Sequence, residues 1–129
     1  MNIKNNNQIS VLISTFNNEN SIKAAVESIQ HQTFENLEIL IMDDGSHDNT
    51  FNICKDLSNE DSRIRIFQNE KNIGLTRSLN KLIKQSQGYY IARQDADDIS
   101  LLSRLETQIK FLKDKNLDIV YSRANIKNS

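Results

Sequence analysis

Cysteine is almost absent from this sequence. Cys54 is the only one, so no disulfide can form within the chain and no cysteine cluster can bind a metal. The chain also lacks a run of about 18 apolar residues, and its asparagine-rich start has neither the charged beginning nor the apolar stretch of a signal peptide. We therefore expect a cytoplasmic chain without a membrane span, with peripheral contact to a membrane as the alternative.

An excess of one charge sign is missing as well. The 16 Lys and Arg residues are mixed with 17 Asp and Glu residues, for a formal net charge of -1. Because no basic stripe results, nucleic acid is not an expected partner. The 129 residues, of which 37% are hydrophobic, suffice for one buried core. We expect a single domain spanning residues 1–129.

Short apolar runs alternate with one-sided helical patterns along the chain. Nearly unbroken apolar runs predict strands that are covered on both faces, whereas IRIF, which alternates with a charged residue, predicts an edge strand. The predicted strands are residues 9–14, 37–42, 64–67, 89–92 and 117–121.

Four amphipathic helices are predicted between these strands, from apolar side chains at helical spacing. Gly74 precedes the third helix, and the fourth is expected over residues 101–113. The expected inward-facing residues are Ile22, Ala25, Val26 and Ile29, then Ile53, Cys54 and Leu57, then Leu75, Leu79, Leu82 and Ile83, and finally Leu102, Leu105, Ile109 and Leu112.

This order of elements predicts an α/β fold with an open, mostly parallel sheet and helices on both faces. In such a sheet, ligands bind beyond the carboxyl ends of the strands. Three polar clusters follow predicted strands at this edge: residues 14–19, 43–46 and 95–98. We expect the three clusters to meet and to form a binding crevice.

The third cluster crowds three carboxylates, Asp95, Asp97 and Asp98, into four residues. Carboxylates this close raise each other's pKa unless a cation or several hydrogen-bond donors offset the charge. Magnesium typically takes one or two protein carboxylates and completes its shell with water and ligand phosphates, so the cluster predicts a divalent cation beside a nucleotide. The alternative is that Asp98 or Ser100 caps the next helix and the other acids are solvated.

A second acid pair, Asp43 and Asp44, precedes Gly45 after the second predicted strand. Its alternative interpretation is local, because aspartate before glycine is typical of tight turns. A functional meaning for both pairs depends on their joint position at one edge of the sheet.

Taken together and in order, these clusters resemble the family 2 glycosyltransferases, whose nucleotide-sugar-dependent members have the GT-A fold. The resemblance covers residues 9–112. VLISTFNNE resembles the first-strand motif, and SIQHQTFENLEILIMDDGSHDNT resembles the second strand with its acid pair. NIGLTRSLN resembles the segment before the third helix, and GYYIARQDADD resembles the fourth strand followed by the aspartate-x-aspartate metal motif.

The resemblance implies a nucleoside diphosphate sugar as ligand, with a UDP-sugar favoured. Asp44 would accept a hydrogen bond from the base, while Thr15, Phe16 and Glu19 would line the base and ribose. The family often has proline and tyrosine in the first motif, where this chain has Ser14 and Phe16. Stacking under the base is therefore expected without a tyrosine hydroxyl contact.

The same resemblance implies roles on the phosphate side. Asp95 would face the ribose, and Asp97 would bind the Mn2+ or Mg2+ that bridges the diphosphate. Asp98 would assist through a water or cap the next helix. Arg77 would approach the phosphates, with a solvated position on the third helix as its alternative.

The implied activity is that of an inverting glycosyltransferase acting on a saccharide or related hydroxyl acceptor, in surface polysaccharide synthesis. The acceptor-binding half, which supplies the general base, does not follow within 129 residues, so we expect a truncated chain that is inactive alone. Its exposed last strands would favour homo-oligomers or aggregation.

Two alternatives to the enzyme stay open at this point. One is a non-catalytic nucleotide-binding fragment of a truncated transferase. The other is a receiver-type signalling domain, although its acid pair should follow the first strand and its phosphoacceptor the third.

Overall fold

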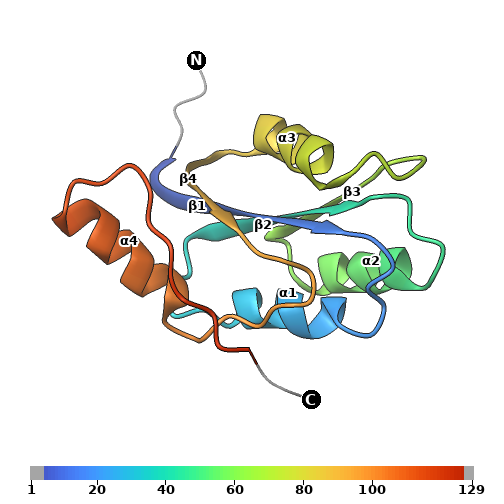
Figure 1. Cartoon of the computed structure of the whole chain (residues 1–129), viewed down its shortest axis with the longest axis horizontal. Coiled ribbons are helices and arrows are strands. Elements are labelled where there is room, and N and C mark those ends of the chain that lie inside the picture. The colour runs from blue at the N-terminus through green and yellow to red at the C-terminus, as the bar shows by residue number, and fades with distance from the viewer. Residues whose placement is uncertain (1–4, 127–129) are drawn as a thin grey trace.

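Strands and helices alternate along the chain (Figure 1). The structure is a computed structural model that describes residues 5–126. The first four predicted strands and the four predicted helices are confirmed. The strands are β1 (Asn5–Thr15), β2 (Leu37–Asp43), β3 (Ile64–Gln68) and β4 (Gly88–Arg93), and the helices are α1 (Ile22–Gln30), α2 (Thr50–Glu60), α3 (Leu75–Gln85) and α4 (Arg104–Asp114).

The four strands form one parallel sheet in the order β3-β2-β1-β4. All seven residues of β2 are buried, in keeping with its mostly apolar sequence, and β3 lies at an edge as predicted. Thr15 of β1 pairs with Asp43 of β2, and Asp43 pairs with Gln68 of β3. These three strands therefore end level, and the residues that follow them share one edge of the sheet.

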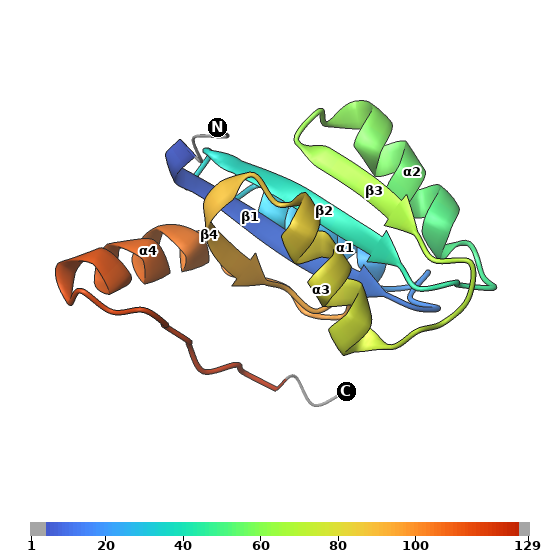
Figure 2. The ribbon, with the colours of Figure 1, turned by 90° about the horizontal axis from the view of Figure 1, so that it is seen from above.

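Helices cover both faces of the sheet, as predicted (Figures 1 and 2). The larger core lies where α1, α2 and α4 pack, and it contains Ile9, Val11 and Ile13 of β1. Cys54 is fully buried in this core, which confirms its prediction as a packing residue. On the opposite face, a smaller cluster joins Leu82 of α3 to β1 and β2.

A buried carboxylate fixes the opposite end of the sheet from the predicted crevice. Ser10 Oγ donates to Glu38 Oε1, and so do the backbone N–H groups of Gln87 and Gly88, at 2.6 and 3.3 Å. Arg65 Nη1 lies 3.3 Å from Glu38 Oε2. Because these residues come from β1, β2, β3 and the start of β4, the contacts hold all four strands in register.

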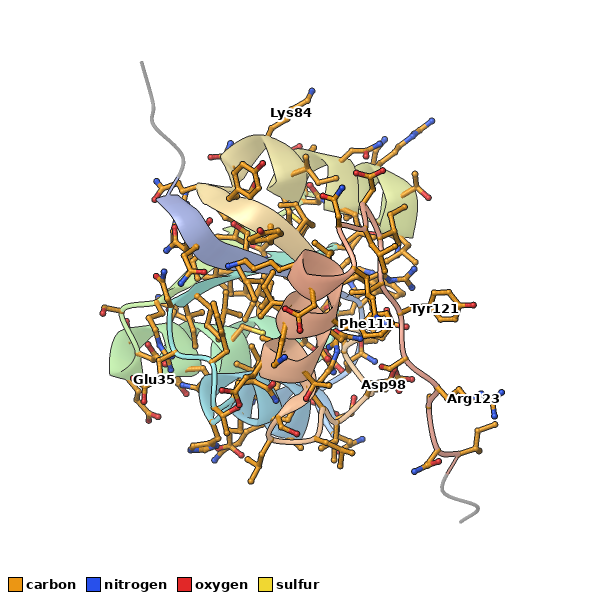
Figure 3. All side chains as sticks on the ribbon, turned by 90° about the vertical axis from the view of Figure 1, so that its left-hand side faces the viewer. Glu35, Lys84, Asp98, Phe111, Tyr121 and Arg123 are labelled. Carbon is orange, nitrogen blue, oxygen red and sulfur yellow. The ribbon has the colours of Figure 1, made fainter. Side chains whose placement is uncertain are left out.

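The predicted fifth strand, residues 117–121, is wrong. The described chain after α4 forms no strand, and Ile119 and Tyr121 are 81% and 88% exposed. Tyr121 and Arg123 project away from the body of the molecule (Figure 3). Gln108 Nε2 of α4 donates to Ser122 Oγ at 3.1 Å, so the segment passes α4 without pairing with a strand. A β-branched sequence needs a backbone partner to become a strand.

Two helix details also differ from the prediction. The fourth helix begins at Arg104 rather than residue 101, which leaves Leu102 exposed before it. In α3 the fully buried residues are Ser78 and Leu82, whereas Leu75 and Ile83 are 46% and 47% exposed. Leu75 is the first residue of α3, and Ile83 lies at the border of the apolar stripe. No helix within residues 5–126 is long and apolar enough to cross a bilayer.

Candidate functional site

The first two predicted clusters meet at the carboxyl ends of β1 and β2. The backbone N–H of Asp44 donates to the carbonyl of Thr15 at 2.8 Å. Asn17 N–H donates to Ser46 Oγ at 2.9 Å, and His47 N–H returns a bond to Asn17 Oδ1 at 2.8 Å. The loop after β1 and the turn after β2 are therefore one bonded unit.

Asp44 joins this unit to the segment before α3. Its carboxylate is 2% exposed and accepts bonds of 2.9 Å from Asn69 Nδ2, Ile73 N–H and Gly74 N–H. Burial raises the pKa of Asp44, but these donors together with the Ser78 hydroxyl outweigh burial and hold the pKa below its usual value. Asp44 is therefore an ionised acceptor with a fixed orientation.

Asp43 anchors the turn that follows β2. Its side chain is fully buried, and Oδ2 accepts from Gln68 Nε2 at 3.1 Å and from Ser46 N–H at 3.3 Å. Gly45 follows with φ at +75°, and a Cβ there would lie 2.8 Å from the carbonyl carbon of Lys71. Only glycine fits at this position, because of its positive φ and because the backbone at Lys71 lies so close. The local interpretation of the acid pair as part of a tight turn therefore holds for Asp43.

Hydrogen bonds from Arg104 hold the chain on both sides of the acidic loop, residues 95–98, which follows β4. Arg104 donates through Nη1 to Gln94 Oε1 at 2.7 Å and to Ser100 Oγ at 2.9 Å, and through Nη2 to the Arg93 carbonyl at 2.8 Å. Burial lowers the pKa of Arg104, while the nearby charges of Asp98 and Asp95 oppose that shift. The guanidinium is thus a partly buried cation beneath the carboxylates.

Each carboxylate of that loop has its own surroundings. Arg93 pairs with Asp95 Oδ1 at 2.9 Å, whereas Asp97 and Asp98 are exposed, and Asp98 lies on the outside of the molecule (Figure 3). Neither Asp98 nor Ser100 caps α4, because the helix begins at Arg104 with Ser103 at its N-cap position. The capping alternative is therefore wrong for both residues.

The side chains near the acidic loop decide whether a divalent cation could bind there. Within residues 5–126, no three acidic, histidine or cysteine side chains gather closely enough to hold a metal. The exposed carboxylates of Asp97 and Asp98 can supply one or two ligands. That number fits magnesium or manganese only when a bound phosphate and water complete the coordination shell.

The predicted base-site residues Phe16, Thr15 and Glu19 differ in exposure and in hydrogen bonding. Phe16 is 39% exposed, and its ring meets the His47 ring edge-on at 6.3 Å between centroids. Thr15 is buried and donates through Oγ1 to Asn18 Oδ1 at 2.9 Å, while the carboxylate of Glu19 accepts from Asn49 N–H at 3.0 Å. Phe16 and Glu19 are exposed, whereas Thr15 is buried.

Arg77 lies exposed in the first turn of α3, three residues after Gly74. That turn is tied to Asp44 through Gly74 N–H. Both interpretations of Arg77, a phosphate contact and a solvated position, are compatible with its place.

Sequence reasoning missed two residues of this site, Asn69 and Arg104. Asn69 is a buried amide directly after β3, next to the position that pairs with Asp43. Arg104 is the first residue of α4. The available signals were a polar residue at the end of the third strand and an arginine soon after the acidic run, and both are common at exposed positions.

Comparison with known proteins gives one consistent result. Residues 10–128 match the family model described as "Glycosyl transferase family 2". The putative glycosyltransferase EpsE of Bacillus subtilis is 40% identical over 107 residues, covering 82% of this chain and 38% of EpsE. The Escherichia coli enzyme WfgD, a UDP-Glc:alpha-D-GlcNAc-diphosphoundecaprenol beta-1,3-glucosyltransferase, is 36% identical over 94% of this chain and 47% of its own length.

Solved structures agree with the family match. S. aureus TarS residues 1–349, in complex with UDP-GlcNAc, superposes with a TM-score of 0.77 at 27% identity over 84% of this chain and 32% of that one. A Pyrobaculum calidifontis mannosyltransferase shares the fold, with a TM-score of 0.76 at 20% identity over 81% of this chain and 32% of that one. The chain spans less than half the length of each of these four proteins.

Proposed function

This chain belongs to glycosyl transferase family 2, and we propose that it forms the donor-binding part of an inverting transferase that uses a nucleoside diphosphate sugar. The observation that carries the proposal is the junction of the loops after β1 and β2 with the segment before α3, where Asp44 is buried, ionised and oriented. The acidic loop follows β4 at the same edge of the parallel sheet. The structure of TarS with UDP-GlcNAc, at 27% identity, supports a nucleotide sugar as ligand. The family match argues against the alternative of a receiver-type signalling domain.

On the base side, Asp44 would accept the ring N–H of a uracil-type base. Its Oδ1 accepts two of the three hydrogen bonds above and Oδ2 accepts one, from Gly74 N–H, so Oδ2 has the greater unused acceptor capacity. The exposed ring of Phe16 would stack under the base. Thr15 and Glu19 would support this subsite by fixing the loop that carries Phe16.

On the phosphate side, Asp97 would bind the divalent cation, with Asp98 assisting, and Asp95 would face the ribose. A bound Mg2+ or Mn2+ would stabilise the charge that develops on the leaving diphosphate. Arg104 supports the exposed carboxylates through the loop backbone and keeps the loop shape fixed. Arg77 would approach the phosphates from the first turn of α3.

The acceptor side of the reaction lies outside these residues. An inverting transfer needs a general base that deprotonates the acceptor hydroxyl for direct attack on the anomeric carbon. Glu38 is buried at the opposite end of the sheet, Asp118 lies exposed after α4, and the acids at the crevice edge would serve the donor site. We propose that the 129 residues alone bind a donor without transferring its sugar. The two interpretations, a nucleotide-binding fragment and the donor-binding part of an enzyme, then predict the same behaviour for this chain.

The whole protein would act on a saccharide or related hydroxyl acceptor in surface polysaccharide synthesis. The name of WfgD, which states a UDP-glucose donor and a lipid-linked saccharide acceptor, supports this class.

Calorimetric titration with UDP tests the donor proposal. Binding should be weak in the presence of a chelator and stronger with Mn2+ or Mg2+, because the acidic loop repels a diphosphate when no cation lies between them. Equal affinity in both conditions would remove the cation from the site. Robust sugar transfer to a saccharide by the monomeric chain would contradict the division into donor and acceptor parts.

A further inference from the structure

A buried amide connects the proposed base acceptor to a surface lysine. Asn69 is 5% exposed, and its backbone N–H donates to the Asp43 carbonyl at 2.9 Å. Its side-chain Nδ2 donates to Asp44 Oδ1 at 2.9 Å and to Ser78 Oγ at 3.1 Å. Its Oδ1 accepts from Lys81 Nζ at 2.7 Å. Every polar group of Asn69 other than its carbonyl is thus engaged.

The chemistry of the two neighbours fixes which way this amide points. A lysine ammonium only donates hydrogen bonds, and an ionised carboxylate only accepts them. The amide oxygen must therefore face Lys81, and the amide nitrogen must face Asp44. A flipped amide would oppose oxygen to oxygen at Asp44 and nitrogen to nitrogen at Lys81.

We infer that Asn69, oriented by Lys81, is a positioning residue for the choice of nucleobase. This inference rests on the proposed role of Asp44 as the base acceptor. Asn69 Nδ2 and Ile73 N–H together occupy Asp44 Oδ1, whereas Oδ2 has one donor, Gly74 N–H, and would be the oxygen that accepts the ring N–H of uracil. Cytosine has no hydrogen at that ring nitrogen and opposes its own acceptor to the carboxylate. The amide therefore contributes to discrimination without touching the ligand.

Lys81 belongs to this arrangement although it lies on the surface. It lines a groove of about 300 Å³ that is floored by Met42 and Phe67, on the α3 side of the sheet. Lys84 lines the same groove and points outward from α3 (Figure 3). Both lysines are positively charged residues of α3, and of the two Lys81 donates a hydrogen bond to Asn69. Lys84 is therefore the matched control.

Asn69→Asp is the most informative variant because it preserves the shape of the side chain and replaces the Nδ2 donor, which bonds Asp44 and Ser78, by an acceptor oxygen. The new carboxylate would face Asp44 from β2 and Lys81 from α3, while Asp43 presents its backbone oxygen on the β2 side. Above the pKa of the paired acids, two anionic oxygens repel and Asp44 loses its orientation. At lower pH a shared proton replaces the lost N–H donor, and the original geometry returns.

The test compares UDP and CDP affinities, with Mn2+ present, for the unaltered chain and its variants. At about pH 8, Asn69→Asp should bind UDP roughly tenfold more weakly than the unaltered chain and should show a smaller preference for UDP over CDP. At about pH 5 the deficit in UDP affinity should shrink to less than about threefold. The comparison at each pH uses the unaltered chain at the same pH, so the titration of the ligand cancels.

The lysine pair provides a second route that does not depend on a buried substitution. Lys81→Met should reduce the preference for UDP over CDP by roughly threefold, because the amide loses the donor that orients it, while Lys84→Met should leave the preference unchanged. Circular dichroism should show both variants folded.

Two outcomes would overturn the inference, and they are distinguishable. If Asp44→Ala removes the preference for uracil while Asn69→Asp and Lys81→Met retain it at every pH, Asn69 has a structural role only and the proposed function stands. If the unaltered chain shows no preference and Asp44→Ala changes nothing, base recognition by Asp44 fails and the inference fails with it.

Discussion

Asp44 and Gly74 are joined by a 2.9 Å hydrogen bond from the glycine N–H to Oδ2 of the carboxylate, across 30 positions of sequence. The bond links the end of β2 to the N-cap of α3, where Gly74 has φ at +93°. One carboxylate therefore determines where α3 begins relative to the sheet. It would also be the group that selects the base, so folding and recognition depend on the same side chain.

The first prediction concerns base selection. Asp44→Ala removes a charge-assisted bond worth about 1.5 to 3 kcal/mol, so UDP affinity should fall by roughly ten- to a hundredfold. CDP affinity should fall less, which narrows the gap between the two nucleotides, while the benefit of added Mn2+ should persist. Titration of both nucleotides measures this. Asp56→Ala, an exposed acid on α2, is the control and should change neither affinity.

The second prediction separates the metal from the base. Asp97→Ala removes the proposed cation ligand, so added Mn2+ should no longer improve UDP binding to a large extent, although the preference for uracil over cytosine should remain. Asp118→Ala removes an equally exposed acid beyond α4 and should behave as the unaltered chain. If Asp97→Ala retains the full metal benefit, its assignment as the ligand is wrong.

The third prediction tests the brace beneath the acidic loop. Arg104→Met removes donors to Gln94, Ser100 and the Arg93 carbonyl and leaves their oxygens poorly paired. The free energy of unfolding should fall by about 2 to 3 kcal/mol, measured by denaturant titration. Lys110→Met on the same helix removes an exposed ammonium and should leave the unfolding midpoint nearly unchanged.

The fourth prediction concerns pH and a carboxylate away from the site. Asp61 accepts hydrogen bonds from the Arg63 side chain, which hold the pKa of Asp61 well below its usual value. A carboxyl group whose pKa is lower in the folded chain than in the unfolded chain stabilises the fold at any pH above the unfolded-chain pKa, which is about 3.9 for aspartate. This contribution is lost as the pH falls toward the lower pKa of the folded chain. Asp61→Asn should therefore cost about 1 kcal/mol near neutral pH and less below about pH 3. A constant difference across this range would contradict the linkage.

Much of the fold follows from pattern alone, and particular residues show why. The run from Leu37 to Met42 has only one charged residue, Glu38, among apolar ones, so a central strand is the arrangement that buries it on both sides. The polar clusters after β1, β2 and β4 share an edge because parallel strands end on the same side. The central strand and the shared edge can both be predicted without knowing which distant residues are in contact.

The parts that sequence reasoning missed all depend on such contacts. LDIVY has the composition of a strand, but pairing requires a neighbour that local sequence does not specify. Asn69 and Arg104 are ordinary polar residues until the fold brings a carboxylate or a carbonyl within 3 Å of them. Their importance lies in partners 25 and 11 positions away, and no periodicity encodes those distances.

The level ends of β1 and β2 have a consequence for how such a chain tolerates length changes. Pairing runs without interruption from Ile9 opposite Leu37 to Thr15 opposite Asp43. A residue added to the loop between α1 and β2 can be absorbed as a longer excursion at the far edge of the sheet. A residue deleted inside β2 would instead move Asp44 to the position of the anchor and Gly45 to the position of the acceptor, so the acceptor carboxylate would be lost. Length changes are therefore tolerated at one edge of the sheet and costly inside the strand that leads to the other.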